Sequence, residues 1–262
     1  MSDLYEELDR QDTPIGELVL RRRRIPGLGD GPLYEIKRDD ELLMSSLVNE
    51  SEQVLAHEAI RAIGDGIYDV LVGGLGLGYT AWAALGYERV RTVTVIELLD
   101  PVIRWHEQGL VPLGQELHDH PRCRFLHGDF FVLATDPAVR DVLHPEGGYG
   151  AILVDIDHAP DAHLHQSHAG FYRPAALERV SELIQPGGAL GVWSAGRPQD
   201  KFTAQLDAVF EGVSIHEVEV YNPLADADQV DTIYVATKAG TIPMAEPTRR
   251  IAPPERKPTP RR

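Results

Sequence analysis

The chain has 262 residues, of which 43% are hydrophobic and 25% are charged, and its formal net charge is −16. This length and composition suit one large globular domain that needs no disulfide, and Cys123 is the single cysteine. The acidity opposes binding to phosphate backbones, so nucleic acid is not expected as a partner. No apolar run approaches the roughly 20 residues that span a bilayer, and the acidic start lacks a signal-peptide pattern. We therefore expect a cytoplasmic protein without a membrane partner.

The first 48 residues predict a small β-subdomain behind a flexible start. Residues 1–12 are polar and predict a flexible segment or a short helix. Over residues 13–48, two β-rich runs flank a turn rich in glycine and proline, and a third run at 42–45 follows Asp39 and Asp40. This order is typical of an antiparallel hairpin with one more strand.

Residues 49–239 predict a single α/β domain. After a helix at 50–63, strands and helices alternate, and the strands are almost continuously apolar. Such strands are typical of a largely parallel sheet covered on both faces, and two final strands with no helix between them indicate an antiparallel edge. From residue 240, prolines and basic residues predict a disordered tail. The expected strands lie at 68–72, 92–96, 123–127, 151–154, 189–193, 213–220 and 232–236, and the later helices at 80–85, 101–108, 174–184 and 200–210.

A strand, a glycine turn and a helix follow one another over residues 68–80. Glycine tolerates positive φ and has no Cβ to collide with a ligand. The helix after the turn points free backbone N–H groups at whatever lies above it. The next strand ends about twenty residues later at Glu97, where nucleotide-binding α/β folds place an acid that accepts hydrogen bonds from ribose hydroxyls. Together these features predict a nucleoside site, with the turn glycines Gly73, Gly74, Gly76 and Gly78.

Further polar residues follow the third and fourth strands of this domain. Gly128 and Asp129 end one strand, and Asp155, Asp157 and His158 follow the next. Parallel sheets bind ligands beyond the carboxyl ends of their strands, so these side chains would lie over the ligand. A carboxylate or imidazole there can take a proton from an attacking amine, hydroxyl or carbon, which makes the last three residues catalytic candidates. The structural alternative is that Asp155 caps the next element and Asp157 is solvated.

This arrangement resembles the class I S-adenosylmethionine-dependent methyltransferase fold, which is Rossmann-like, with a mostly parallel seven-stranded sheet. Within that fold it is most similar to the spermidine synthase family, which transfers an aminopropyl group from decarboxylated S-adenosylmethionine to a diamine. The family's nucleotide loop falls on residues 73–78, its ribose acid on Glu97, and its adenine-contacting pair on Gly128 and Asp129. The resemblance implies S-adenosylmethionine or its decarboxylated form as donor, a small-molecule acceptor and a homodimer.

The acceptor half of the site departs from the family's pattern. Asp155 matches the family's first catalytic aspartate, but His158 stands where the second is expected, and Gly76 replaces a loop aspartate. A buried diammonium ligand needs carboxylates near both ends, so these departures weaken the case for putrescine. The predicted function is a transferase that moves a methyl or aminopropyl group onto a small acceptor.

Two other classes of protein share part of this pattern. A non-catalytic nucleoside-binding protein would keep the donor pocket without the acceptor acids. An NAD-dependent oxidoreductase would share the glycine turn and Glu97, but it gives no role to Asp129 or Asp155. The histidine-rich segment 158–168 has no strong zinc spacing, so no metal is predicted, and we expect it to form a lid over the acceptor.

Overall fold

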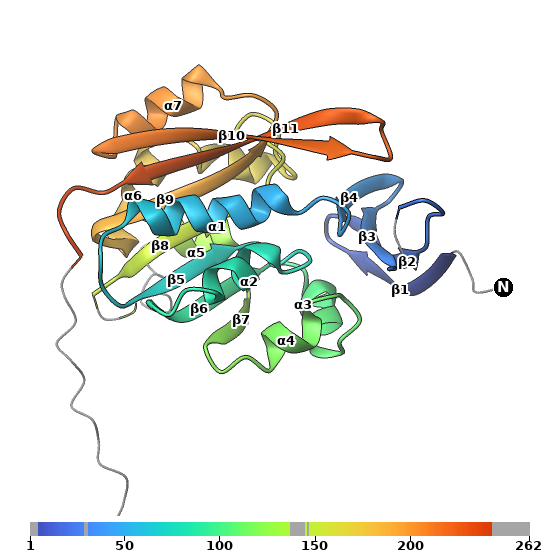
Figure 1. Cartoon of the computed structure of the whole chain (residues 1–262). Helices are drawn as coiled ribbons and strands as arrows, with labels where there is room; N and C mark the ends of the chain where they lie inside the picture. The colour runs from blue at the N-terminus through green and yellow to red at the C-terminus, as the bar shows by residue number, and fades with distance from the viewer. Residues whose placement is uncertain (1–4, 29–30, 137–144, 146, 243–262) are drawn as a thin grey trace, which may run out of the picture.

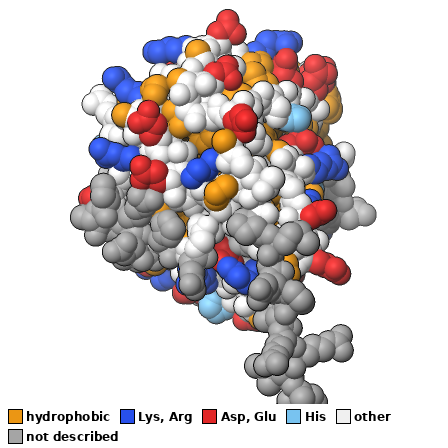
Figure 2. Space-filling model, turned by 90° about the vertical axis from the view of Figure 1, so that its left-hand side faces the viewer, with side chains coloured by type: hydrophobic (Ala, Val, Ile, Leu, Met, Phe, Trp, Pro, Cys, Tyr) orange, Lys and Arg blue, Asp and Glu red, His pale blue; other side chains and the backbone are white. Residues whose placement is uncertain are grey.

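The structure is a computed structural model, and it describes residues 5–28, 31–136, 145 and 147–242. A four-stranded sheet at the N-terminus stands beside a seven-stranded sheet with helices on both faces (Figure 1). On the side away from the N-terminal sheet, acidic, basic and apolar side chains are interspersed (Figure 2). The predicted disordered tail lies outside the described residues from 243 onward.

The N-terminal sheet is antiparallel throughout and has the order β1-β2-β3-β4. The predicted hairpin and its third strand are confirmed. The prediction of a flexible or helical start is wrong for the residues of β1, which pair with β2. The sequence of β1 shows no alternation of apolar residues, so it gave no strand signal. Polar contacts support its pairing with β2, such as the ion pair of Arg22 with Glu6 at 2.7 Å. The strands are β1 (Tyr5–Thr13), β2 (Gly16–Arg23), β3 (Leu33–Arg38) and β4 (Glu41–Ser45).

The large sheet has the order β10-β11-β9-β8-β5-β6-β7. Strands β5 to β9 run parallel, and β11 is antiparallel to both β9 and β10. The predicted fold class, a mostly parallel seven-stranded sheet with an antiparallel edge, is therefore confirmed. The strands are β5 (Tyr68–Gly73), β6 (Val90–Glu97), β7 (Cys123–His127), β8 (Tyr149–Val154), β9 (Ile184–Ala195), β10 (Gly212–Asn222) and β11 (Ala227–Thr237).

Helices cover both faces of this sheet, and each face has its own apolar core. One core contains residues of α1 (Glu50–Ala62), α2 (Tyr79–Leu85), α3 (Asp100–Glu107) and α4 (Gly114–His118). The other contains residues of α5 (Phe130–Thr135), α6 (Pro174–Leu183) and α7 (Asp200–Asp207). Helices α4 and α5 were not predicted, because such short segments show no helical periodicity. Among the described helices, none is long and apolar enough to cross a membrane.

The chain reverses its direction across the sheet between β5 and β8. From β5 it proceeds outward through β6 and β7, and it then returns to β8 on the other side of β5. Loops after β5 and β8 therefore diverge at their carboxyl ends, which is where open α/β sheets bind ligands. The backbone N–H of Asp155 donates to the carbonyl of Gly73 at 2.9 Å, so the two predicted site segments meet at this point.

Candidate active site

A cavity of about 300 Å³ opens at the point where the sheet reverses. Its walls come from the N-terminal sheet, the first turn of α1, the loops after β5, β6 and β8, and the hairpin of β10 and β11. Elements far apart in the sequence thus share one site. Among the residues that line it are Met44, Glu52, Gly76, Glu97, Asp155 and Asp231.

The glycine loop forms one wall of the cavity, and three of its glycines need the left-handed backbone. The φ angles of Gly74, Gly76 and Gly78 are +92°, +48° and +95°. A Cβ on Gly74 would lie 2.1 Å from the carbonyl oxygen of Asp155, so no other residue fits there without a shift of the backbone. Gly73 lies within β5 instead, where a Cβ would meet the ring of Phe130 at 2.7 Å.

Glu97 ends β6 and lines the cavity beside this loop. Its Oε2 accepts from the backbone N–H of Leu75 at 2.9 Å, and its Oε1 accepts from that of Leu99 at 2.8 Å. Burial raises the pKa of this carboxyl, and the backbone hydrogen bonds oppose that rise. Backbone N–H groups thus fix the orientation of this carboxylate on the cavity wall, where the ribose of a nucleoside is predicted.

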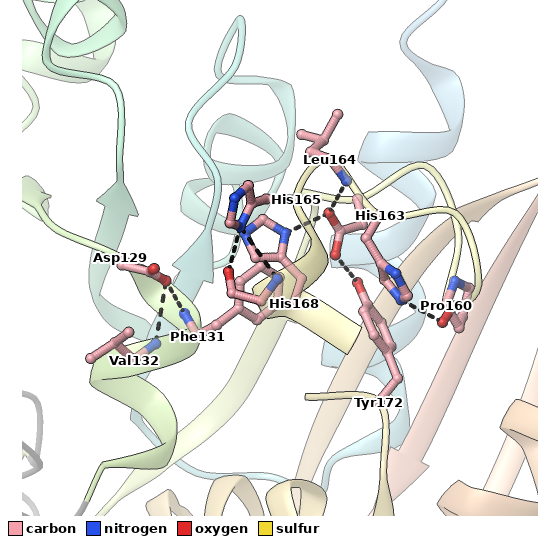
Figure 3. Close-up of polar contacts among 11 residues, drawn as sticks. Asp129, Phe131, Val132, Pro160, His163, Leu164, His165, His168 and Tyr172 are labelled. Atoms are coloured by element: carbon pink, nitrogen blue, oxygen red, sulfur yellow. Dashed lines mark hydrogen bonds and ion pairs between the residues drawn. The ribbon is translucent and has the colours of Figure 1, made fainter. Parts of the chain in front are cut away.

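Gly128 and Asp129 follow β7, as predicted, but neither lines the cavity. Asp129 is the N-cap of α5, and its Oδ1 accepts from the backbone N–H groups of Phe131 and Val132 at 2.9 and 3.2 Å (Figure 3). This geometry is a common way to satisfy the first turn of a helix. The predicted contact of these two residues with adenine stays a prediction.

Asp155 lies on the cavity wall directly after β8. Its Oδ2 accepts from the hydroxyl of Thr80 at 2.7 Å. Burial raises the pKa of Asp155 to about 6; the Thr80 hydrogen bond opposes this rise, and the charge of Asp231 adds to it. The carboxylate is thus ionised at neutral pH but more basic than an exposed aspartate, which suits a proton acceptor.

Two further carboxylates reach the same cavity, and sequence reasoning missed both. Glu52 lies in the first turn of α1, and Asp231 lies in β11. The hydroxyl of Ser51 donates to Asp231 Oδ2 at 2.7 Å and lies 3.2 Å from Glu52 Oε2. Burial, together with the charge of Asp155, raises the pKa of Glu52 to about 8. The sequence held one signal of the second residue: Asp231 stands directly before the otherwise apolar strand segment 232–236.

Asp231 is 1% exposed, and its Oδ1 has no hydrogen-bond partner among the described residues. Burial raises the pKa of this carboxyl as well. An unpartnered buried carboxylate oxygen is costly. Its place on a cavity wall leaves this oxygen accessible to a group that enters the cavity.

Asp157 does not line the cavity, in contrast to the other two predicted catalytic residues. It is 2% exposed, and Oδ1 accepts from the backbone N–H of Leu164 and from Nδ1 of His168, both at 2.8 Å (Figure 3). Its Oδ2 accepts from the hydroxyl of Tyr172 at 3.0 Å. The carboxylate therefore holds the segment after β8 in place, and the alternative of a solvated Asp157 is wrong because the side chain is buried. The catalytic role predicted for Asp157 stays a prediction.

His158 lines the cavity, and its buried Nε2 has no partner within the described part of the chain. Other histidines of this segment have local roles: His163 Nε2 contacts the carbonyl of Pro160 at 2.8 Å, and His165 caps a short 3-10 helix, η2 (Gln166–Gly170). Across the residues that the structure describes, no three His, Cys, Asp or Glu side chains are grouped to hold a metal ion.

Comparisons with curated proteins and with solved structures both find proteins similar to this chain. No protein-family model matches the chain. It is 28% identical over 187 residues to a polyamine aminopropyltransferase of Sulfolobus acidocaldarius, an alignment that covers 67% of the chain and 56% of that relative. The chain thus spans little more than half the length of this curated protein.

Solved structures extend the likeness to most of the chain. A spermidine synthase in complex with the transition-state analogue AdoDATO has a TM-score of 0.68 at 15% identity, covering 89% of this chain and 74% of its own. The chain has the fold of the spermidine synthases. The spermidine synthase of Thermotoga maritima has the same TM-score at 13% identity, covering 89% of this chain and 73% of its own. The spermidine synthase-like resemblance predicted from short motifs is therefore confirmed.

Proposed function

We propose that the chain is an aminopropyltransferase that uses decarboxylated S-adenosylmethionine as donor and a cationic amine as acceptor. The observation that carries this proposal is the meeting of three carboxylates, Glu52, Asp155 and Asp231, in one cavity beside the glycine loop. Buried carboxylates at this density need positive charge to offset their desolvation and mutual repulsion. An amine acceptor supplies that charge.

The same three carboxylates favour the decarboxylated donor over S-adenosylmethionine itself. The amino-acid tail of S-adenosylmethionine carries a carboxylate, which this anionic cavity would repel. Decarboxylation leaves a tail with only an ammonium group, which the cavity attracts. Aminopropyl transfer is therefore favoured over methyl transfer.

In the proposed reaction, Asp155 takes a proton from the acceptor amine, whose nitrogen then attacks the carbon next to the sulfonium. A C–N bond forms while the C–S bond breaks, and the sulfur leaves with the electron pair as neutral methylthioadenosine. Glu52 and Asp231 hold the remaining positive charge of the acceptor. The glycine loop and Glu97 hold the nucleoside so that the two reacting atoms stay in line.

The two acceptor acids that the sequence pattern lacks at Gly76 and His158 are thus replaced from other elements. Glu52 comes from α1 and Asp231 from β11. Diamines, putrescine among them, remain candidate acceptors, as the name of the Sulfolobus relative suggests.

Product formation tests the proposal. The protein is incubated with decarboxylated S-adenosylmethionine or S-adenosylmethionine and a panel of mono-, di- and polyamines, and products are identified by mass spectrometry. We expect methylthioadenosine and an aminopropylated amine with the decarboxylated donor alone. A methylated product from S-adenosylmethionine would overturn the choice of group, and nucleoside binding without any product would instead identify a non-catalytic nucleoside-binding protein.

A further inference from the structure

His168 forms part of the cavity wall but has no role in the proposed reaction. It lies in η2, is 5% exposed, and packs against the ring of Phe131 with 4.2 Å between ring centroids. Its Nδ1 contacts Asp157 Oδ1 at 2.8 Å, and no described residue is hydrogen-bonded to its Nε2. Figure 3 shows His168 beside Phe131 in the first turn of α5.

The neighbours of Asp157 decide which ring nitrogen carries the proton. A backbone N–H and a tyrosine hydroxyl also donate to this carboxylate, from Leu164 and Tyr172. An ionised carboxylate only accepts hydrogen bonds, so Nδ1 of His168 must be the donor. In the neutral ring, Nε2 then presents a lone pair and accepts hydrogen bonds. Asp157 therefore sets the tautomer of His168.

The ring contact of His168 places it beside the first turn of α5. Asp231 lies on β11 and Asp155 follows β8, so the carboxylates occupy the half of the sheet edge from β11 to β8. His168 packs against Phe131 in the first turn of α5, and the ring of the neighbouring Phe130 lies beside Gly73, where the glycine loop begins. His168 therefore lies on the cavity wall next to the glycine loop, where the proposed function places the nucleoside.

We propose that Nε2 of His168 accepts a hydrogen bond from the exocyclic amino group of the donor's adenine, with Asp157 as a positioning residue. This inference rests on the proposed function, which supplies the nucleoside. The resemblance assigned the base to Gly128 and Asp129, which do not line the cavity, whereas Leu164 and His168 do. A base with an oxo group at the position of the amino group would be rejected, because its oxygen and Nε2 of His168 are both hydrogen-bond acceptors.

The test is calorimetry with 5′-methylthioadenosine and 5′-methylthioinosine, which differ in this group. We expect the wild type to prefer methylthioadenosine by about tenfold or more, the range expected for one unpaired buried polar group. The His168→Leu substitution should abolish this preference by weakening methylthioadenosine alone. A preference that survives in His168→Leu overturns the assignment, while a wild type that binds neither compound overturns the proposed function with it.

Two further variants separate the tautomer from the packing of the segment. Asp157→Ala removes the acceptor that holds the proton on Nδ1, so the preference for methylthioadenosine should narrow. Tyr172→Phe removes another hydrogen bond to the same carboxylate and should keep the wild-type preference. Nitrogen-15 NMR of the wild type should show a proton on Nδ1 of neutral His168, and a proton on Nε2 would overturn the inference.

Discussion

The two halves of the cavity are built in different ways. The donor half consists of a glycine loop and Glu97, which belong to consecutive elements and use mostly backbone geometry. The acceptor half consists of side chains from α1, the end of β8, and β11. Backbone geometry tolerates few residue types, whereas an anionic pocket can be assembled from any element that reaches it. On the proposed function, this difference explains why the donor motif matches the family while the acceptor acids come from other elements.

Removing the general base Asp155 should have the largest effect of these substitutions. The effect should be confined to the half of the cavity that binds the amine. In Asp155→Asn we expect turnover to fall by about 10²–10⁴-fold, because general-base catalysis is lost. Affinity for methylthioadenosine should stay near that of the wild type. Methylthioadenosine release and calorimetry measure the two quantities, and Glu88→Gln, at an exposed acid, is the control. Equal losses in turnover and nucleoside affinity would show that the halves are not separate.

A side chain in the glycine loop should damage the donor half. In Gly74→Ala, the new Cβ would lie 2.1 Å from the Asp155 carbonyl oxygen, so we expect a loss of about 3 kcal/mol in unfolding free energy and of nucleoside binding. Gly27→Ala is the matched control, since Gly27 has a φ of +90° with nothing within 4 Å. It should cost only about 1–2 kcal/mol, the penalty of the left-handed backbone. Denaturant unfolding compares the two, and similar losses would refute the steric argument.

The acceptor half should make the free protein less stable as pH rises. Burial raises the pKa of Glu52 to about 8 and of Asp155 to about 6, above the ordinary values of 4.5 and 3.8. Between pH 4 and 8 the folded state then binds more protons than the unfolded state, so the free energy of unfolding falls with rising pH. Since each pKa unit is worth about 1.4 kcal/mol, we expect a decrease of several kcal/mol, measured by denaturant unfolding across this range.

Glu52→Gln should flatten this pH dependence by removing the group with the higher pKa. An acceptor amine at saturating concentration should flatten it as well, because the ligand's charge stabilises the ionised carboxylates. The pH dependence of Glu52→Gln shows what the other carboxylates contribute. If the unfolding free energy of the free wild type rises more steeply than that of the variant from pH 5 to 8, the burial of Glu52 is contradicted.

Substitution of Asp231 should have the smallest effect, and it should change only the binding of the amine acceptor. In Asp231→Asn we expect the KM for the amine to rise by about tenfold, the loss of one charge-assisted hydrogen bond. Nucleoside affinity should not change, because Asp231 lies at the far end of the cavity from Glu97. Steady-state kinetics measure this, and Asp228→Asn, at an exposed aspartate of the same strand, is the control. An unchanged KM would remove Asp231 from the acceptor site.

Most of the fold was predictable because its signals are local. Apolar runs, helical spacing and turn glycines act within a few residues, and they located all seven strands of the large sheet. The strand β1 was missed because its polar residues are held by partners distant in sequence, such as the bond from Trp105 Nε1 to Asp9 at 2.7 Å.

The sequence by itself determined the donor half, since a strand, a glycine turn and a terminal acid specify their own geometry. Tertiary structure alone decided which carboxylates share the cavity. Ser51 and Asp231 are 180 positions apart, and only the sheet order brings them within hydrogen-bond distance. It also turned Asp157 away from the cavity and His168 toward it, because the direction of a side chain after a strand depends on how the following segment packs.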